Sequence, residues 1–277
     1  MFVTAVGLAV FLYIKPILQP ETTFRISSLL KESVQLILIS SQYGEIELEQ
    51  REDGWFMTKP MQARVDKTKV ERILDLLAAT SEYRLPLDNF GRYGLSAPIV
   101  QLQMNHELFA FGQLAPVSNR QYIMTQAGVF LISPHHAALL MVSPTELIDR
   151  RLLNDDEIPQ EFIWGNIHVK QAEKWYILPE PVDIELSQDD IHQWVHSWRL
   201  AQASYLSKSE NGSGDTKEKL SIILQTGKQI HFSIVQREPE LVLLRGDNLI
   251  QYHFLGQSEN QLLSPNFLAK HEEKIVE

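Results

Sequence analysis

The 277-residue chain contains no cysteine. This absence excludes disulfides, thiol nucleophiles, cysteine-ligated zinc sites and the cysteine of a lipoprotein anchor. The chain also has few basic residues, since 25 Lys and Arg stand against 35 Asp and Glu, for a net charge of −10 and a pI near 5.4. Because binding to nucleic acid draws on clustered Lys and Arg, this charge argues against nucleic acid as a partner.

Sequence signatures of common reaction centres are missing as well. The sequence has no phosphate loop, no nucleophile elbow and no dinucleotide fingerprint. We therefore predict no enzymatic activity, no catalytic residues and no cofactor. What is present, 44% hydrophobic and 22% charged residues, is typical of a globular protein long enough for one large domain or two small ones.

One long apolar run opens the chain, from Phe2 to Ile14. A helix over residues 2–18 would reach about 25 Å, a little short of the roughly 30 Å hydrocarbon core. We predict a single-pass anchor over residues 1–18 in a bacterial inner membrane, with the bulk of the chain in the periplasm. A buried core helix and a cleavable signal peptide are the alternatives. Because Lys15, Arg25 and Lys31 all follow the run, we expect the natural start to lie upstream and to supply basic residues.

A strand that ends at a proline, followed by an amphipathic helix, occurs twice in the sequence. The strands are Trp55–Pro60 and Trp175–Pro179. The four apolar positions of each helix are Val70, Ile73, Leu74 and Leu77 in the first occurrence and Ile191, Trp194, Val195 and Trp198 in the second. Each position is displaced by 121 residues, as from Val70 to Ile191. This spacing predicts a duplicated fold unit.

Alternating apolar and polar residues predict the strands of each copy. In the first copy they are 34–40, 45–50, 54–58, 100–104, 108–112, 121–125 and 129–133, with helices at 67–81 and 134–142. In the second copy they are 162–164, 167–171, 174–178, 220–224, 230–232, 241–244 and 249–252. Asp66 and Ser187 are the expected N-caps of the two amphipathic helices.

These elements predict an α+β protein made of two tandem copies of an antiparallel meander, a helix and a second meander, preceded by a membrane helix. The predicted parts are an anchor (1–18), a tether (19–33), a first repeat (34–143), a connector (144–161), a second repeat (162–265) and a polar tail (266–277).

Several motifs of the first copy and of the connector occur together in one bacterial family. They are Gly54-Trp55-Phe56 with Pro60, Tyr93-Gly94-Leu95 with Pro98, a strand ending at Gly112, and Arg150-Arg151-Leu152-Leu153. With the N-terminal apolar run, they resemble the family named Domain of Unknown Function 4340. The resemblance covers most of the first copy and the connector. It implies a membrane-anchored envelope protein, in some members encoded beside ABC-transporter components, and it assigns no catalytic residues.

Two histidine pairs could suggest metal sites. His192 and His196 lie four apart on the second helix, a spacing at which two imidazoles can share one metal. No third ligand is evident, and two histidines that flank the apolar stripe are the simpler interpretation. His135-His136 lies at a strand-to-helix turn, where a cap or surface role is the expected one. Asp189-Asp190 falls in a first helical turn and is interpreted as capping.

Tryptophan and the connector charges offer two further candidates. Trp55, Trp175, Trp194 and Trp198 could line a sugar-binding groove, but core packing explains their positions. Arg150-Arg151 beside the acidic run 155–157 predicts a solvated or inter-domain ion-pair patch, with contact to an acidic partner as the alternative.

The preferred function from these observations is a non-enzymatic interaction or accessory protein of an envelope or transporter complex, with the membrane and a protein as partners. The alternative is a periplasmic ligand-binding protein that holds a glycan or lipid in a crevice between the copies. A metal-dependent hydrolase that uses His192 and His196 comes third.

Overall fold

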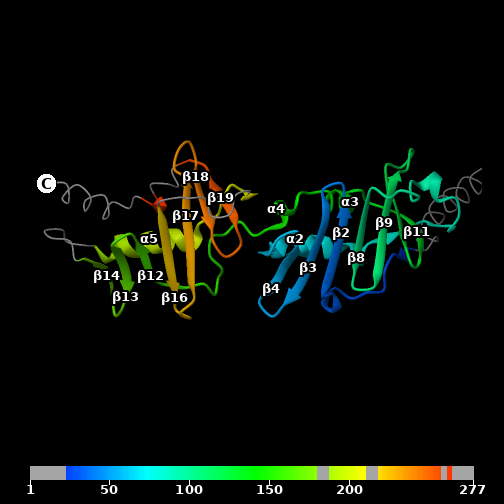
Figure 1. Cartoon of the computed structure of the whole chain (residues 1–277). Coiled ribbons are helices and arrows are strands. Elements are labelled where there is room, and N and C mark those ends of the chain that lie inside the picture. The colour runs from blue at the N-terminus through cyan, green and yellow to red at the C-terminus, as the bar shows by residue number, and fades with distance from the viewer. Residues whose placement is uncertain (1–22, 180–186, 210–217, 257–260, 264–277) are drawn as a thin grey trace, which may run out of the picture. The chain divides into compact units, whose positions relative to one another are not determined.

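The computed structural model describes residues 23–179, 187–209, 218–256 and 261–263 of the chain. Strands predominate in these residues and form three sheets of two, nine and eight strands, with a few helices (Figure 1). The described residues divide into two compact units, one within Met1–Gln50 and Val70–Val142 and the other within Arg51–Lys69 and Ser143–Glu277. The predicted α+β class with antiparallel sheets is confirmed.

The nine-stranded sheet has the order β5-β4-β3-β2-β8-β9-β10-β11-β7. Its strands are β2 (Leu36–Ser41), β3 (Gly44–Arg51), β4 (Gly54–Lys59), β5 (Ala63–Arg64), β7 (Arg84–Leu85), β8 (Val100–Met104), β9 (Glu107–Leu114), β10 (Gln121–Thr125) and β11 (Gly128–Ile132). Buried Ile37 and Ile39 of β2 lie opposite Leu48 and Ile46 of β3. The period-2 alternation seen in the sequence therefore sets the register that buries one face.

The eight-stranded sheet has the order β14-β13-β12-β16-β17-β18-β19-β15. Its strands are β12 (Pro159–Trp164), β13 (Ile167–Gln171), β14 (Trp175–Leu178), β15 (Tyr205–Lys208), β16 (Lys219–Leu224), β17 (Gln229–Gln236), β18 (Leu241–Arg245) and β19 (Ile250–Phe254). Consecutive strands β12 to β14 and β16 to β19 pair antiparallel, as a meander requires. Strand β15 was not predicted from the sequence.

The first amphipathic helix is shorter than predicted. Helix α2 (Lys67–Leu74) begins at the predicted cap, since the Thr68 amide donates to Asp66 Oδ1 at 2.9 Å. It tightens into a 3-10 turn, η3 (Asp75–Ala78), and does not continue to Ser81. The reason is that β6 (Thr80–Ser81) is extended and pairs with β1 (Phe24–Arg25) in the two-stranded sheet.

Four other short helices lie between residues 31 and 147. They are η2 (Lys31–Ser33), η4 (Phe90–Tyr93), α3 (His135–Ala138) and α4 (Pro144–Leu147). The helix predicted over 134–142 is thus limited to α3. The next helix, α4, begins after Ser143, which forms a capping box with Glu146.

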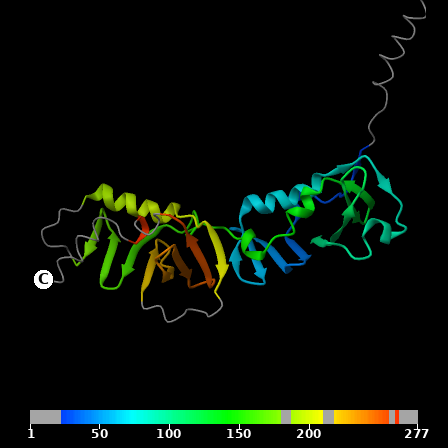
Figure 2. The ribbon, with the colours of Figure 1, turned by 90° about the horizontal axis from the view of Figure 1, so that it is seen from above.

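Helix α5 (Gln188–Leu200) lies along one face of the eight-stranded sheet (Figure 2). Its predicted cap is confirmed, because Ser187 Oγ accepts from the Asp190 amide at 3.4 Å. The buried face holds Trp198, whose ring lies 5.9 Å from Phe162 and 5.8 Å from Phe232, centroid to centroid. The core of this sheet is therefore aromatic where α5 packs on it.

Two glycines of the family motifs sit where no larger side chain fits. Gly94 ends η4 at φ +69°, and a Cβ there would lie 2.8 Å from the Gln113 backbone nitrogen. A Cβ on Gly112 of β9 would lie 2.1 Å from the Tyr93 carbonyl oxygen. Both glycines therefore allow the loop 91–95 to pack directly on β9.

The predicted anchor (1–18) and polar tail (266–277) lie outside the described residues, and so does part of the predicted tether, residues 19–22. Within the described ranges, no helix is long and apolar enough to cross a membrane.

Candidate functional site: an ion-paired cavity

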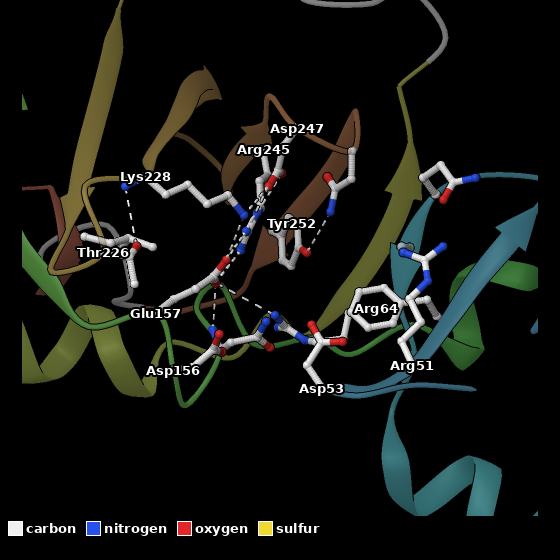
Figure 3. Close-up of a pocket in the computed structure, with 16 residues that line it drawn as sticks. Arg51, Asp53, Arg64, Asp156, Glu157, Thr226, Lys228, Arg245, Asp247 and Tyr252 are labelled. Atoms are coloured by element: carbon white, nitrogen blue, oxygen red, sulfur yellow. Dashed lines mark hydrogen bonds and ion pairs between the residues drawn. The ribbon is translucent and has the colours of Figure 1, made fainter. Parts of the chain in front are cut away.

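A cavity of about 280 Å³ lies in the second unit (Figure 3). Its lining comes from the segment 51–64, the connector 154–157, the turn between β16 and β17, and the hairpin of β18 and β19. The charged members are the basic Arg51, Arg64, Lys228 and Arg245 and the acidic Asp53, Asp156, Glu157 and Asp247. The lining is therefore strongly polar but carries as many acids as bases.

Arg245, the last residue of β18, is the most deeply buried charge of the lining, with 4% of its surface exposed. Its guanidinium donates to both carboxylate oxygens of Glu157, at 2.7 and 3.1 Å, and to both of Asp247, at 2.8 and 2.9 Å. It also donates to the Leu152 carbonyl. These five bonds match the five N–H donors of a guanidinium, so the buried charge is fully satisfied.

Arg64 of β5 forms a second centre of the network. Its Nε donates to Asp149 Oδ2 at 3.2 Å, its Nη2 donates to the Arg151 carbonyl at 3.1 Å, and its Nη1 lies 3.8 Å from Glu157 Oε2. Glu157 thus lies between two guanidinium groups, as Figure 3 shows. Arg151 continues the chain of ion pairs to Asp149 and Asp155, each at 2.8 Å.

The pairing fixes the charge of Arg245 and of its two carboxylate partners. Burial by itself would raise the pKa of Glu157, but the hydrogen bonds and charge of Arg245 outweigh it and hold that pKa below its usual range. The same balance, burial against Arg245, lowers the pKa of Asp247. Burial would lower the pKa of Arg245, yet Asp247 and Glu157 raise it. All three groups therefore stay ionised at neutral pH.

This arrangement is suited to holding segments together and poorly suited to acid-base chemistry. A general acid or base works best with a pKa near the working pH, and the shifts here move the pKa values away from it. Lys228 lies at the edge of this network, with Nζ 3.7 Å from Glu157 and 4.0 Å from Asp247 and with 57% of its side chain exposed.

The connector charges predicted from the sequence belong to this network and are only partly solvated, since Arg151 pairs with Asp155, whose side chain is 94% exposed. Asp149 and Glu157 are buried, and Glu157 pairs with Arg245 and Arg64, not with the adjacent arginines. Sequence reasoning missed Arg64 and Arg245. The only available signal was that Arg245 ends the apolar run of β18, since the partner Glu157 is 88 residues away.

The other candidate residues are not brought together with the cavity. The four tryptophans weighed for a sugar groove are buried in the core. His192 and His196 are exposed on α5, and the described residues contain no group of three or more possible metal ligands. His135 and His136 begin α3 with their ring centroids 3.8 Å apart, and His136 is buried.

The fold and the cavity define an α+β protein of large antiparallel sheets, with a polar cavity that is crossed by ion pairs. Residues 55–174 match the model of the family described as Domain of unknown function (DUF4340), the same family that the sequence motifs resemble. The comparisons with curated proteins and with solved structures found no match.

Proposed function

We propose that this chain is a non-enzymatic interaction or accessory protein of an envelope or ABC-transporter complex. In this proposal residues 1–18 anchor it in a bacterial inner membrane and its bulk lies in the periplasm. The apolar run from Phe2 to Ile14 supports the anchor. The ion pairing of Arg245 supports a binding role over a catalytic one, because Arg245, Glu157 and Asp247 are engaged with one another.

We further propose that the two large sheets are copies of one ancestral unit. Their strand orders support this. The order β4-β3-β2-β8-β9-β10-β11-β7 corresponds, element by element in chain order, to β14-β13-β12-β16-β17-β18-β19-β15. The helix follows the third meander strand in both, and the buried helical positions are the ones related by 121 residues in the sequence, as in Val70 and Ile191.

The observation that carries the binding proposal is the outer strand β14. It ends the hydrogen-bonded order of its sheet and, among the described residues, pairs with β13 alone. Tyr176 and Leu178 are 38% and 45% exposed and alternate with the buried Trp175 and Ile177. The Gln188 side chain bonds the amide and the carbonyl of Trp175 at the start of this strand. Beyond Trp175 the edge offers backbone donors and acceptors together with two apolar side chains, so an extended segment of a partner protein can pair with it there.

Site-specific crosslinking tests this proposal. A photoreactive phenylalanine analogue replaces Tyr176 in the full chain, expressed in the bacterium that carries it. The matched control places the analogue at Tyr43, which is 49% exposed in the turn between β2 and β3. We expect an adduct with an envelope or transporter protein from position 176 and not from position 43. Self-adducts alone from position 176, or release of the chain without detergent, would contradict the proposal.

The second candidate function is ligand binding, and the cavity is the observation that favours it. Its charged lining matches the hydroxyl groups of a glycan better than the acyl chain of a lipid. Titration with a chitin tetrasaccharide, followed by thermal unfolding, tests this candidate. A rise in melting temperature that is absent in Lys228→Ala would support it, and unchanged melting of the wild type would count against this glycan class.

A further inference from the structure

A second group of polar side chains gathers on strands β15 and β19. Tyr205 and Ser207 alternate with buried Leu206 along β15, and Gln251 and His253 alternate with buried Tyr252 along β19. The register places Tyr205 opposite His253 and Ser207 opposite Gln251. Because successive side chains of a strand point to opposite faces, all four lie on the same face of this strand pair.

Short contacts join these side chains in a line. Ser207 Oγ lies 2.8 Å from His253 Nε2. His253 Nδ1 lies 3.0 Å from Oε1 of Glu240, the residue that precedes β18. The Tyr205 hydroxyl donates to both carboxylate oxygens of Glu240, at 2.8 and 3.0 Å. The Tyr205 ring is stacked on the His253 imidazole, with centroids 4.2 Å apart and planes 15° from parallel. The imidazole is thus held between a hydroxyl and a carboxylate.

The protons in this line can be assigned from the carboxylate. Hydrogen bonds from Tyr205 and then from His253 lower the pKa of Glu240, so it is ionised at neutral pH and can only accept. His253 Nδ1 must therefore carry the proton it donates to Glu240. In the neutral imidazole Nε2 is then an acceptor, and the proton it accepts is that of the Ser207 hydroxyl. This is the order nucleophile, base, orienting acid of serine hydrolases.

We propose that Ser207 is a reactive nucleophile that takes an acyl group from a carboxylic ester. Ser207 Oγ attacks the ester carbonyl carbon while its proton passes to His253 Nε2. When the tetrahedral adduct collapses, the bond from carbon to the leaving alkoxide breaks, and His253 returns the proton to that alkoxide. The product is an ester on Ser207 and a free alcohol, with no change of oxidation state.

Gln251 is a second partner of Ser207. The Ser207 hydroxyl lies 3.1 Å from Gln251 Oε1, an acceptor that competes with His253 Nε2 for the one hydroxyl proton. A half turn of the amide would present its Nε2 to Ser207 and leave the hydroxyl proton to His253. The binding role proposed above rests on strand β14, and its crosslinking test does not involve Ser207, so each proposal can fail without the other. Labelling of Ser207 would replace only the non-enzymatic part of the proposed function.

A fluorophosphonate probe tests the proposal on the purified chain. Attack of Ser207 Oγ on phosphorus expels fluoride, and the added mass is located by peptide mapping. We expect the label on Ser207 and none in Ser207→Ala. His253→Gln should slow labelling by about 100-fold or more, because it removes the base. Glu240→Gln should slow it by roughly tenfold or more, because the imidazole loses its orienting acceptor.

The chain contains a matched control for a chance serine–histidine contact. Ser221 Oγ lies 2.8 Å from His231 Nδ1, but no carboxylate is bonded to that imidazole among the described residues. Ser221→Ala should label like the wild type. Equal labelling of Ser221 and Ser207, or unchanged labelling rates in His253→Gln and Glu240→Gln at unchanged melting temperature, would overturn the proposal. So would failure of the folded wild type to label at Ser207.

Discussion

The two amphipathic helices bury corresponding faces with different side chains. The face of α2 and η3 is aliphatic, with Val70, Ile73, Leu74 and Leu77, whereas α5 buries Trp194 and Trp198 beside Ile191 and Val195. Aliphatic side chains need no hydrogen-bond partner, but a buried indole N–H does. Both indoles of α5 donate to the Leu262 carbonyl, at 2.9 and 3.1 Å. The aromatic version of this face therefore depends on a backbone acceptor from a later segment of the chain.

The same contrast holds for charge. In the first unit the pairs Lys31–Asp75 and Arg120–Glu82 are exposed, whereas the second unit buries Arg245, which pairs with Glu157 and Asp247. An exposed pair is screened by water and contributes little, but a buried charge that loses its partner is strongly destabilising. The second unit should accordingly be the more sensitive of the two to polar substitutions.

Loss of the buried guanidinium should have the largest effect. We expect Arg245→Met to lower the free energy of unfolding by about 3 to 5 kcal/mol, because it strands Glu157 and the Leu152 carbonyl. Arg120→Met, which removes an exposed pair in the first unit, should cost about 1 kcal/mol or less. Urea unfolding followed by tryptophan fluorescence and circular dichroism measures both. Equal costs for the two variants would remove the distinction between the units.

Conservative replacement of the α5 tryptophans should come next. Trp198→Phe should cost about 1 to 2 kcal/mol, since one indole donor to Leu262 remains. The double variant with Trp194→Phe should cost more than the sum of the singles, because the Leu262 carbonyl then loses both donors. In the first unit Ile73→Val should cost about 0.5 to 1.5 kcal/mol, with no such coupling to expect. Strict additivity of the two Trp variants would show that the shared acceptor does not matter.

The units should also differ in the pH at which they lose stability. In the first unit, burial and then the neighbouring His135 lower the pKa of His136 to about 4. The unfolded chain, with a histidine pKa of about 6.5, therefore binds the proton more readily than the folded chain does. Stability should fall as the pH drops from about 6.5 to 4. In the second unit the pKa values of Glu157 and Asp247 are lowered, so their contribution holds above the unfolded carboxyl pKa of about 4 and is lost below it.

Thermal unfolding between pH 3 and 8 would separate the two windows. His136→Gln should flatten the loss between pH 6.5 and 4 by on the order of 1 kcal/mol and leave the loss at lower pH intact. An unchanged profile in His136→Gln would mean that this histidine is not buried in its neutral form.

Helix caps should give the smallest effects. Asp66→Ala at α2 removes a 2.9 Å bond to the Thr68 amide and should cost about 1 kcal/mol. Ser187→Ala at α5 removes a longer, 3.4 Å bond and should cost about 0.5 kcal/mol. Urea unfolding of both variants measures the two costs. A larger cost for Asp66→Ala would show that cap geometry decides the effect, whereas a larger cost for Ser187→Ala would show that the size of the packed helix face decides it.

The sequence pattern predicted those strand and helix bounds that depend only on neighbouring residues. The bounds of β10 and β13 and the start of α5 followed from alternation and a capping serine. The early end of α2 could not be predicted, because it depends on Thr80 pairing with Arg25 of a strand far away in the sequence. Strand β15 was not predicted because Tyr205–Lys208 is short and is recognised as a strand only by its pairing with β19.

The cavity was the least predictable feature, for the same reason. Glu157 was visible as part of an acidic run, but a run of charges is usually solvated. Its burial follows from Arg64 and Arg245, which come from β5 and β18 and are distant from it in the sequence. The family motifs with Gly94 and Gly112 were informative because their role, close backbone approach, is a property of glycine itself.

The most direct test of whether β14 or the cavity binds the partner replaces the buried Arg245–Glu157 pair and measures crosslinking from β14 in the same variant. The chain with Arg245→Met and Glu157→Leu keeps the volume of the pair without its charges and should remain folded. If the cavity only holds the unit together and the edge strand binds the partner, the crosslink from position 176 should appear at the wild-type level. Loss of that crosslink in the folded variant would contradict the account and assign the binding site to the cavity.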